Sequence, residues 1–192
     1  MDDLGVMIET LHKSNSFVVI DLETTGLNYS GGDRITEICC YSIENGEIKD
    51  SYHTLVNPDR YIPSNITEIT GISNNMVRYS PKFYSIAQAI IDFIGDKPIV
   101  CHNVEFDLDK FLVPMYMDIG YEIPNRNICT LKLARLFMSS LPSKKLGSVY
   151  TALTRKKPMN SHRALGDVAM TCEVLLKFKE FVDNNYDKII SS

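Results

Sequence analysis

Two carboxylates stand two residues apart at the end of a very apolar segment. Asp21 and Glu23 follow residues 17–20 (FVVI) and precede residues 24–26 (TTG). In an extended strand, side chains two residues apart point to the same face, so both carboxylates face one way. Two anions this close repel each other unless a positive charge lies between them, and a divalent cation supplies that charge. The alternative is a strand end that has simply reached solvent, and this pair alone does not decide between the two.

Three further residues stand near the beginnings of later predicted helices. Asp107 follows a predicted strand at residues 98–102, near the carboxyl edge of the sheet, where open α/β sheets place their ligands. Asp167 lies near the start of the last predicted helix, and His162 precedes that helix. Taken singly, each has an ordinary explanation, because acidic residues stabilise helix N-termini and a lone histidine is usually a surface or capping residue. Their meaning therefore depends on the whole set.

Three segments of the chain form a recognisable set of motifs. Residues 21–27 (DLETTGL), 102–107 (HNVEFD) and 162–167 (HRALGD) resemble the three exonuclease motifs of the DEDDh family. Within that family they are most similar to the DnaQ-like proofreading exonuclease of bacterial DNA polymerase III, of the epsilon and PolC type. The stretch from Asn57-Pro58 to residues 69–72 (ITGI) also resembles the family's link between its third strand and first helix. The resemblance covers about residues 16–180, and three motifs in order are far more specific than any one of them.

The resemblance implies a reaction and a role for each residue. Asp21, Glu23, Asp107 and Asp167 would bind two Mg²⁺ or Mn²⁺ ions, hard cations that prefer oxygen ligands. Two such ions can stabilise the attacking and the leaving oxygen of an in-line phosphoryl displacement. His162 would accept a proton from the attacking water, a role that suits an imidazole pKa near neutrality. The implied enzyme is a 3′→5′ exonuclease that releases nucleoside 5′-monophosphates, and the histidine, in place of a tyrosine, places it in the DEDDh branch.

Possible substrate contacts come from the first two motifs. The backbone of residues 24–26 could hold the terminal nucleotide, and Leu27 could wedge against its base, with core packing as the alternative for Leu27. Asn103 could either cap a helix or contact nucleic acid. Phe106 and Phe111 offer stacking surfaces, although a helix that places them five apart is expected to bury at least one. The candidate substrate-binding residues are Thr24, Thr25, Gly26, Leu27, Asn103 and Phe106.

The elements that must position these residues follow from the hydrophobic pattern. Residues 16–23 predict a buried strand, and residues 34–43 and 48–56 predict two more, joined through Asn45-Gly46, the strongest short-range hairpin signal. A short helix is expected at residues 4–11. The chain therefore opens with three antiparallel strands.

The rest of the chain alternates helices with strands after a polar stretch that has a turn at Thr70-Gly71. Asn103 and Thr130 can cap helices, Pro114 should kink or break the first of these, and Leu165 belongs to the apolar side of the last helix. The predicted helices are residues 84–94, 103–120, 130–137, 145–154 and 163–182, and the predicted strands are 98–102 and 127–130. Together with the resemblance, this order predicts an α/β fold of the ribonuclease H-like type, with a mixed five-stranded sheet flanked by helices. We expect one exonuclease domain over residues 1–192, with a catalytic core at about 16–182.

Composition bounds the class of protein. The chain has 192 residues, a formal net charge of −4, and five cysteines without a C-x-x-C pair, which argues against a disulfide scaffold or a zinc site. The negative charge argues mildly against a protein that coats nucleic acid, but bound cations would reverse the local field at clustered carboxylates. Residues 1–14 do not form a signal peptide, and no apolar run approaches the ~20 residues that span a bilayer. A cytoplasmic protein without a membrane partner is expected.

Nucleic-acid 3′ ends are the expected partner, and DNA is favoured over RNA by the resemblance only. An exoribonuclease that trims RNA 3′ ends is the rival within the same chemistry, because the deciding 2′-OH contact cannot be predicted from the residues. A DNA polymerase subunit is a further expected partner, in proofreading or repair. A non-catalytic, polymerase-associated binding subunit is the rival from another class, and the presence of all five catalytic positions argues against it.

Several charged or titratable residues outside the motifs have weaker interpretations. The basic clusters at residues 143–145 (SKK) and 155–157 (RKK) could guide a single strand into the site, or could be solvated faces. His12 and His53 have no partner pattern and are expected to be incidental. His102 is expected to orient its neighbours and not to bind metal.

Overall fold

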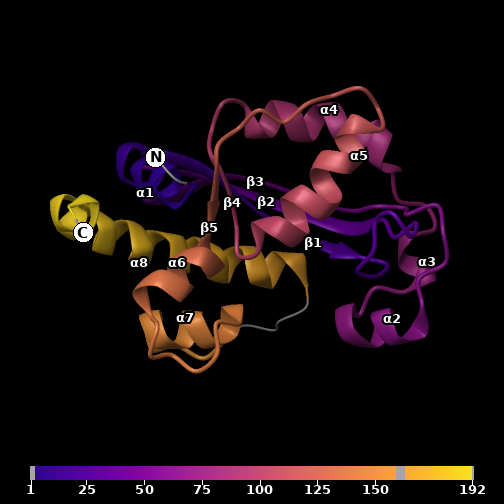
Figure 1. Ribbon diagram of the computed structural model, residues 1–192. Helices are drawn as coiled ribbons and strands as arrows, with labels where there is room; N and C mark the ends of the chain where they lie inside the picture. The colour runs from indigo at the N-terminus through magenta and orange to yellow at the C-terminus, as the bar shows by residue number, and fades with distance from the viewer. Residues whose placement is uncertain (1–2, 159–162, 192) are drawn as a thin grey trace.

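Five strands form one mixed sheet, in the order β3-β2-β1-β4-β5 (Figure 1). The computed structural model describes residues 3–158 and 163–191. β1 (Ser16–Thr24) pairs antiparallel with β2 (Ile35–Glu44), which pairs antiparallel with β3 (Glu47–Leu55). On the other side of β1, β4 (Ile99–Cys101) runs parallel to it, and β5 (Asn127–Cys129) runs parallel to β4. The predicted α/β class, with three antiparallel strands followed by parallel ones, is confirmed.

Helices cover both faces of this sheet. The long helix α8 packs along β1 and β2 and against α1, and in Figure 1 it lies across the sheet from α4 and α5. Within the described residues, no helix is both long enough and apolar enough to cross a membrane. The described helical segments are α1 (Asp3–Lys13), α2 (Ser64–Thr70), α3 (Asn74–Val77), α4 (Phe83–Ile94), η1 (Glu105–Leu112), α5 (Val113–Met117), α6 (Thr130–Phe137), α7 (Leu146–Thr154) and α8 (Ala164–Ile190).

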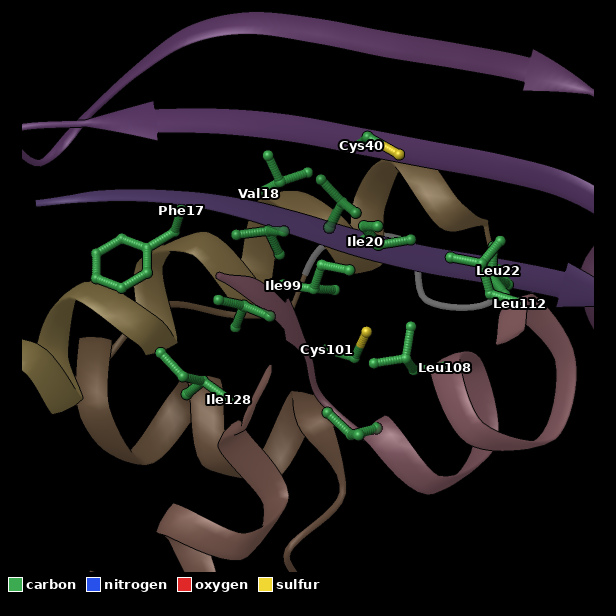
Figure 2. Close-up of a cluster of buried hydrophobic side chains, with 14 of the residues drawn as sticks. Phe17, Val18, Ile20, Leu22, Cys40, Ile99, Cys101, Leu108, Leu112 and Ile128 are labelled. Carbon is green, nitrogen blue, oxygen red and sulfur yellow. The ribbon is translucent and has the colours of Figure 1, made fainter. Parts of the chain in front are cut away.

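The central strand β1 is buried on both faces. Phe17, Val18, Val19 and Ile20 are each at most 1% exposed, and Figure 2 shows side chains of β1 together with Ile99 of the neighbouring β4 in the same cluster. A strand that is covered on both faces needs apolar side chains at successive positions. This explains why residues 17–20 form a continuous apolar run and do not alternate with polar residues.

The turn between β2 and β3 agrees with the predicted hairpin. Asn45 has a φ of 53° and Gly46 a φ of 81°. A two-residue hairpin turn of type I′ requires positive φ at both central positions, which asparagine and glycine adopt at the lowest cost. The hairpin fixes the register between β2 and β3, in which Glu44 lies opposite Glu47.

The polar stretch after β3 contains two short helices that the sequence pattern does not predict. α2 ends at Gly71, whose φ is 71° and whose N–H donates to the carbonyl of Thr67 (2.8 Å). Ile62, Ile72 and Val77 are buried in a small cluster of their own beside these helices. So few apolar residues do not reveal a helical period, and only the turn was predictable.

The segment after β4 is wound differently from the single helix that was predicted. η1 is a π-helix, and α-helical winding begins in α5, where Pro114 lies in the first turn. Because proline has no N–H to donate, this change of winding agrees with the predicted break. The predicted cap is wrong, since Val104 is the N-cap residue and no side chain caps it. Asn103 contributes only its carbonyl, which accepts from the amides of Phe106 and Asp107 at 3.0 Å each.

Two details of the later helices also differ from expectation. Thr130 is the first residue of α6 and not its cap, because its hydroxyl is hydrogen-bonded to His102 (2.8 Å). Leu165 is 46% exposed, whereas its neighbour Ala164 is buried against the core. α8 begins where predicted but continues to Ile190.

All five cysteines are free and buried. Burial raises the pKa of Cys40 and Cys101 well above that of an ordinary thiol, and raises the pKa of Cys39 to about 12. Thiols held in the neutral form in this way behave as small apolar core residues.

Candidate active site

Three carboxylates from two distant segments meet near the end of β1. Asp21 and Glu23 belong to β1, and Asp167 lies in the first turn of α8. One oxygen from each of the three lies within 4.8 Å of the other two. The packing of α8 along β1 brings these segments together, although they are far apart in the sequence. Such a set of oxygen ligands suits a hard divalent cation such as Mg²⁺ or Mn²⁺.

Asp107 is buried beside this cluster, in the first turn of η1. The backbone near Leu22 and Asn103 lowers the pKa of its carboxylate, but burial raises that pKa by more. It does not join the group whose oxygens all lie within 4.8 Å of one another. Its charge nevertheless acts on Asp21, and the charge of Asp167 acts on it. The four predicted carboxylates therefore share one electrostatic environment.

Burial and mutual repulsion disfavour the ionised forms of these acids. Burial, followed by repulsion from Asp107, Asp167 and Glu23, raises the pKa of Asp21 well above its usual value. Burial, followed by repulsion from Asp167, raises the pKa of Glu23 to about 8. Burial also raises the pKa of Asp107 to about 8, and repulsion from Asp167 adds to this shift. A divalent cation between the oxygens would reverse this penalty, because it stabilises the ionised forms. The donor set and its electrostatics thus both fit a bound metal.

The predicted general base, His162, lies outside the described residues. Arg163, the next residue in the sequence, is the N-cap residue of α8. The assignment of His162 as general base therefore stays a prediction.

The loop after β1 presents Leu27 to solvent. Leu27 is 70% exposed, so the alternative of core packing for this residue is wrong. Thr24 and Thr25 are buried, and their hydroxyls donate to the carbonyl of Gly26 (2.6 Å) and to Oδ1 of Asp33 (2.9 Å), respectively. The threonine side chains therefore hold the loop, while the side chain of Leu27 stays exposed.

Asp33 organises this loop and was not predicted from the sequence. Besides the hydroxyl of Thr25, it accepts the backbone N–H of Asn28 (2.9 Å) and pairs with Arg60 (3.3 Å). A Cβ on Gly26 would lie only 2.3 Å from Oδ2 of Asp33, so only glycine fits there without displacement of this side chain. An aspartate in a glycine-containing loop often bonds nearby backbone, and that was the available signal.

The candidates from the second motif lie on and beside η1. The rings of Phe106 and Phe111 pack with centroids 5.0 Å apart, and Phe111 is fully buried. The expectation that this pair buries at least one ring is confirmed. Asn103 is half-buried, and its side chain makes no hydrogen bond within the described residues.

His102 orients its surroundings, as expected. Its Nε2 bonds the carbonyl of Lys144 (2.9 Å), and a carbonyl only accepts, so Nε2 carries the proton. Nδ1 then accepts from the hydroxyl of Thr130 (2.8 Å). Burial lowers the pKa of His102, which favours this neutral form. The ring thus links the end of β4 to the start of α6.

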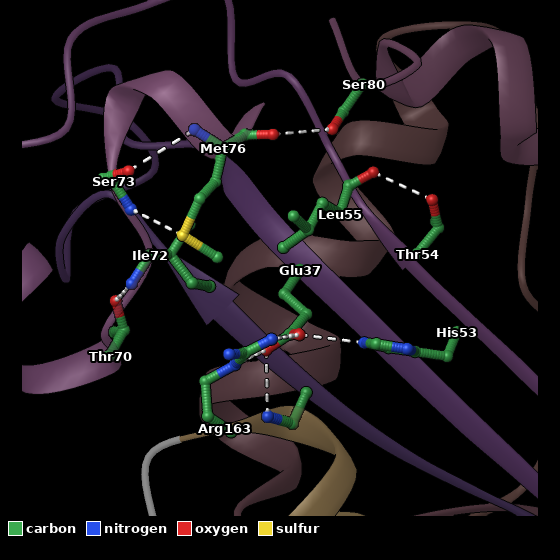
Figure 3. A network of polar contacts seen from close by, with 11 residues as sticks. Glu37, His53, Thr54, Leu55, Thr70, Ile72, Ser73, Met76, Ser80 and Arg163 are labelled. Atoms are coloured by element: carbon green, nitrogen blue, oxygen red, sulfur yellow. Dashed lines mark hydrogen bonds and ion pairs between the residues drawn. The ribbon is translucent and has the colours of Figure 1, made fainter. Parts of the chain in front are cut away.

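Glu37 is a fully buried acid at the edge of the site that was not predicted from the sequence. It pairs with Arg163 (2.7 Å) and with Nε2 of His53 (2.8 Å) (Figure 3). The expectation that His53 is incidental is therefore wrong. A lone charged residue within the apolar run of β2 was the only signal in the sequence.

The two basic clusters are partly paired within the protein. Lys144 donates to the backbone carbonyls of Ser139 (3.3 Å) and Leu141, and Lys156 pairs with Glu173 (2.6 Å). The other basic residues of the clusters are exposed, namely Lys145, Arg155 and Lys157. A role for them in guiding nucleic acid stays a hypothesis.

Comparison with known proteins gives a consistent set of relatives. A family model described as exonuclease (RNase T type) matches residues 18–175. The DNA polymerase III of PolC type from Clostridium perfringens is 37% identical over 173 residues, which are 88% of this chain but 12% of that protein. The DNA polymerase III subunit epsilon of Aquifex aeolicus is 33% identical over 166 residues, which are 86% of this chain and 81% of that subunit.

A solved structure extends the comparison to the fold. Exonuclease X in complex with 5′ overhanging duplex DNA superposes with a TM-score of 0.68 at 29% identity, over 88% of this chain and 93% of that one. This likeness confirms the predicted ribonuclease H-like fold.

Proposed function

The chain belongs to the DnaQ-like exonuclease family, and from this premise we propose that it is a metal-dependent 3′→5′ exonuclease that releases nucleoside 5′-monophosphates from single-stranded or frayed DNA ends. The observation that supports this most strongly is the convergence of Asp21, Glu23 and Asp167, whose oxygens lie within 4.8 Å of one another. The protein tolerates the repulsion among them, which suits a site that binds cations and then a phosphodiester.

The proposed reaction assigns a role to each part of the site. Asp21, Glu23 and Asp167 would hold the divalent cations, and Asp107 would add its charge from the buried side. When bound, such cations stabilise the charge of the reacting phosphate and lower the pKa of the attacking water. His162 would accept the proton of that water as its oxygen bonds to phosphorus and the bond from phosphorus to the 3′ oxygen breaks.

The preference for DNA rests on the relatives. Two of them are named as DNA polymerase III proteins, and the solved relative at 29% identity is bound to duplex DNA. We extend the proposal to proofreading or repair together with a DNA polymerase, on the same support. The chain spans 12% of the PolC-type relative, so the activities of that whole protein remain outside the proposal.

The deciding experiment is Mg²⁺-dependent digestion of a 3′-labelled single-stranded oligonucleotide, with DNA and RNA side by side. We expect mononucleotides from DNA, at a faster rate than from RNA, and loss of activity in Asp21→Ala. Asp187→Asn is a matched control, because Asp187 is an exposed acid further along the same helix as Asp167. The absence of product in both Mg²⁺ and Mn²⁺, or an unchanged rate in Asp21→Ala, would refute the assignment. Faster digestion of RNA would replace DNA by RNA as the substrate.

A further inference from the structure

Glu37 lies directly opposite Glu23 in the register of β1 and β2. It is completely buried, yet it is not one of the three carboxylates whose oxygens converge. An acid in this place could have been a metal ligand, so its actual partners decide what it does.

Within the described residues, the Glu37 carboxylate accepts four hydrogen bonds, from His53, Arg163 and Ala164 (Figure 3). Oε1 is bonded to Nε2 of His53 (2.8 Å) and to the guanidinium of Arg163 (2.7 Å). Oε2 is bonded to Nε of Arg163 (3.2 Å) and to the backbone N–H of Ala164 (3.1 Å). Both oxygens are therefore committed to protein donors, and the paired contact with Arg163 fixes the orientation of the carboxylate.

Two of these partners form the beginning of α8. Arg163 is the N-cap residue of that helix, and its own side chain makes no capping bond. Ala164 is the first helical residue, and its N–H would otherwise lack a partner, as N–H groups at helix starts do. Glu37 supplies the missing acceptor from a neighbouring strand, and its negative charge also suits the helix N-terminus.

Backbone hydrogen bonds connect the anchored Arg163 to Asp167, which is a member of the carboxylate cluster. The carbonyl of Arg163 accepts the backbone N–H groups of Gly166 (2.9 Å) and Asp167 (3.2 Å). The position of Asp167 relative to β1 thus depends on where Arg163 is held, and Glu37 holds it to the same sheet that carries Asp21 and Glu23.

We infer that Glu37 is a positioning residue of the active site, which fixes the first turn of α8 against β2 and thereby sets Asp167 at the distance from Asp21 and Glu23 that a shared cation needs. This inference rests on the proposed function. Residues that orient metal ligands from outside typically change metal affinity or activity by about 10- to 100-fold when they are replaced.

Glu37→Gln is the informative variant because every group that faces the carboxylate is a donor. In either orientation, the amide NH₂ of glutamine would point at a donor of Arg163, so the anchor is lost although the size of the side chain is kept. Glu44→Gln is the matched control, since Glu44 lies on the same strand but pairs with Ser16 at the far end of the β1–β2 ladder.

The test combines calorimetric titration with Mn²⁺ and steady-state digestion of the labelled DNA oligonucleotide. For Glu37→Gln we expect the Kd for Mn²⁺ to rise about 10-fold and kcat to fall about 10-fold or more, with KM for the oligonucleotide nearly unchanged. Glu44→Gln should match wild type in all three quantities. A lowered Tm with wild-type kcat and Kd would show that Glu37 only stabilises the fold, and would overturn the inference.

A second variant decides the matter if Glu37→Gln does not fold. Arg163→Lys keeps the positive charge but cannot make the paired contact, so we expect a weaker change in the same direction in both kcat and the Kd for Mn²⁺. Wild-type values in Arg163→Lys would then refute the inference. If wild type itself releases no nucleotide, the proposed function fails, and the Mn²⁺ affinities alone still test whether Glu37 positions the cluster.

Discussion

The buried carboxylates make the metal-free protein sensitive to pH. Glu23 titrates near its ordinary pKa of 4.5 in the unfolded chain, but burial and repulsion from Asp167 raise its pKa to about 8 in the fold. Asp107 behaves in the same way, because burial raises its pKa from 3.8 to about 8. Between these values the folded protein binds more protons than the unfolded chain does. Its free energy of unfolding therefore falls as pH rises through this range.

We expect the melting temperature in EDTA to fall between pH 5 and pH 8. Mn²⁺ should raise it more at pH 8 than at pH 5, because the cation competes with protons for the same oxygens. Scanning calorimetry with and without Mn²⁺ measures both effects, and Asp187→Asn should reproduce the wild-type curves. A melting temperature in EDTA that is constant over this range would contradict the raised pKa of Glu23 and Asp107.

Loss of the exposed Leu27 side chain should slow the digestion of paired DNA ends more than that of single strands. Because Leu27 is 70% exposed, Leu27→Ala should change the free energy of unfolding by no more than about 0.5 kcal/mol. If Leu27 separates the terminal base from its partner, digestion of a fully paired 3′ end should slow several-fold more than digestion of a single strand. Ile69→Ala, which removes an exposed side chain from α2, is the control. Equal slowing on both substrates would argue against a wedge.

At the scale of elements, the loop after β1 should depend on a glycine without a side chain. Gly26→Ala would place a Cβ 2.3 Å from Oδ2 of Asp33, which must then give up its bonds to Thr25 and to the backbone of Asn28. We expect KM for the oligonucleotide to rise, because the loop carries Leu27, and a loss of about 1–3 kcal/mol of stability from the clash. Asp33→Asn should raise KM in the same way without the clash. Unchanged KM in both variants would show that this loop does not contact the substrate.

Elements with a long or regular hydrophobic pattern were predictable from the sequence. β1, β2 and the start of α8 were predicted within one or two residues, because burial dictates residue type at many of their positions. β3 is mostly exposed, and it was predicted to the same precision because the Asn45-Gly46 turn indicates a hairpin. α2 and α3 were not predicted, because a few apolar residues carry no period. The predicted caps at Asn103 and Thr130 were wrong. At Thr130 the reason is a tertiary contact, because its hydroxyl donates to Nδ1 of His102 and so does not cap α6.

In the active site, too, the features set by local geometry were predictable from the sequence, and those set by tertiary packing were not. The convergence of Asp21 with Glu23 follows from strand geometry alone, whereas that of Asp167 needs the packing of α8 and was predicted only through the family motifs. Glu37 was missed because its partner Arg163 is 126 residues away in the sequence, and no local pattern links the two.

At the scale of the whole molecule, the carboxylate cluster exists only when the chain is folded. Its three members come from β1 and α8, and Asp107 beside it comes from η1, so an unfolded chain offers no comparable set of ligands. Binding of a cation should therefore stabilise the entire fold. At a free Mn²⁺ concentration about 100 times the Kd, we expect the free energy of unfolding to rise by about 2.7 kcal/mol.

Urea denaturation with and without Mn²⁺ measures this coupling. Asp167→Asn should lose most of the Mn²⁺-dependent stabilisation, and Asp187→Asn should keep it. A similar stabilisation of both variants would mean that Mn²⁺ acts elsewhere on the protein.

Because all five cysteines are buried, a single cysteine introduced at an exposed position can be labelled selectively. A maleimide dye reacts with exposed thiolates, and the native thiols are shielded from solvent, with the pKa of Cys39, Cys40 and Cys101 raised by burial. We expect the folded wild-type protein to remain unlabelled and Leu27→Cys to take up one dye, as counted by mass spectrometry. Fluorescence from that position would then report the arrival of a DNA end directly, without removal of any native cysteine.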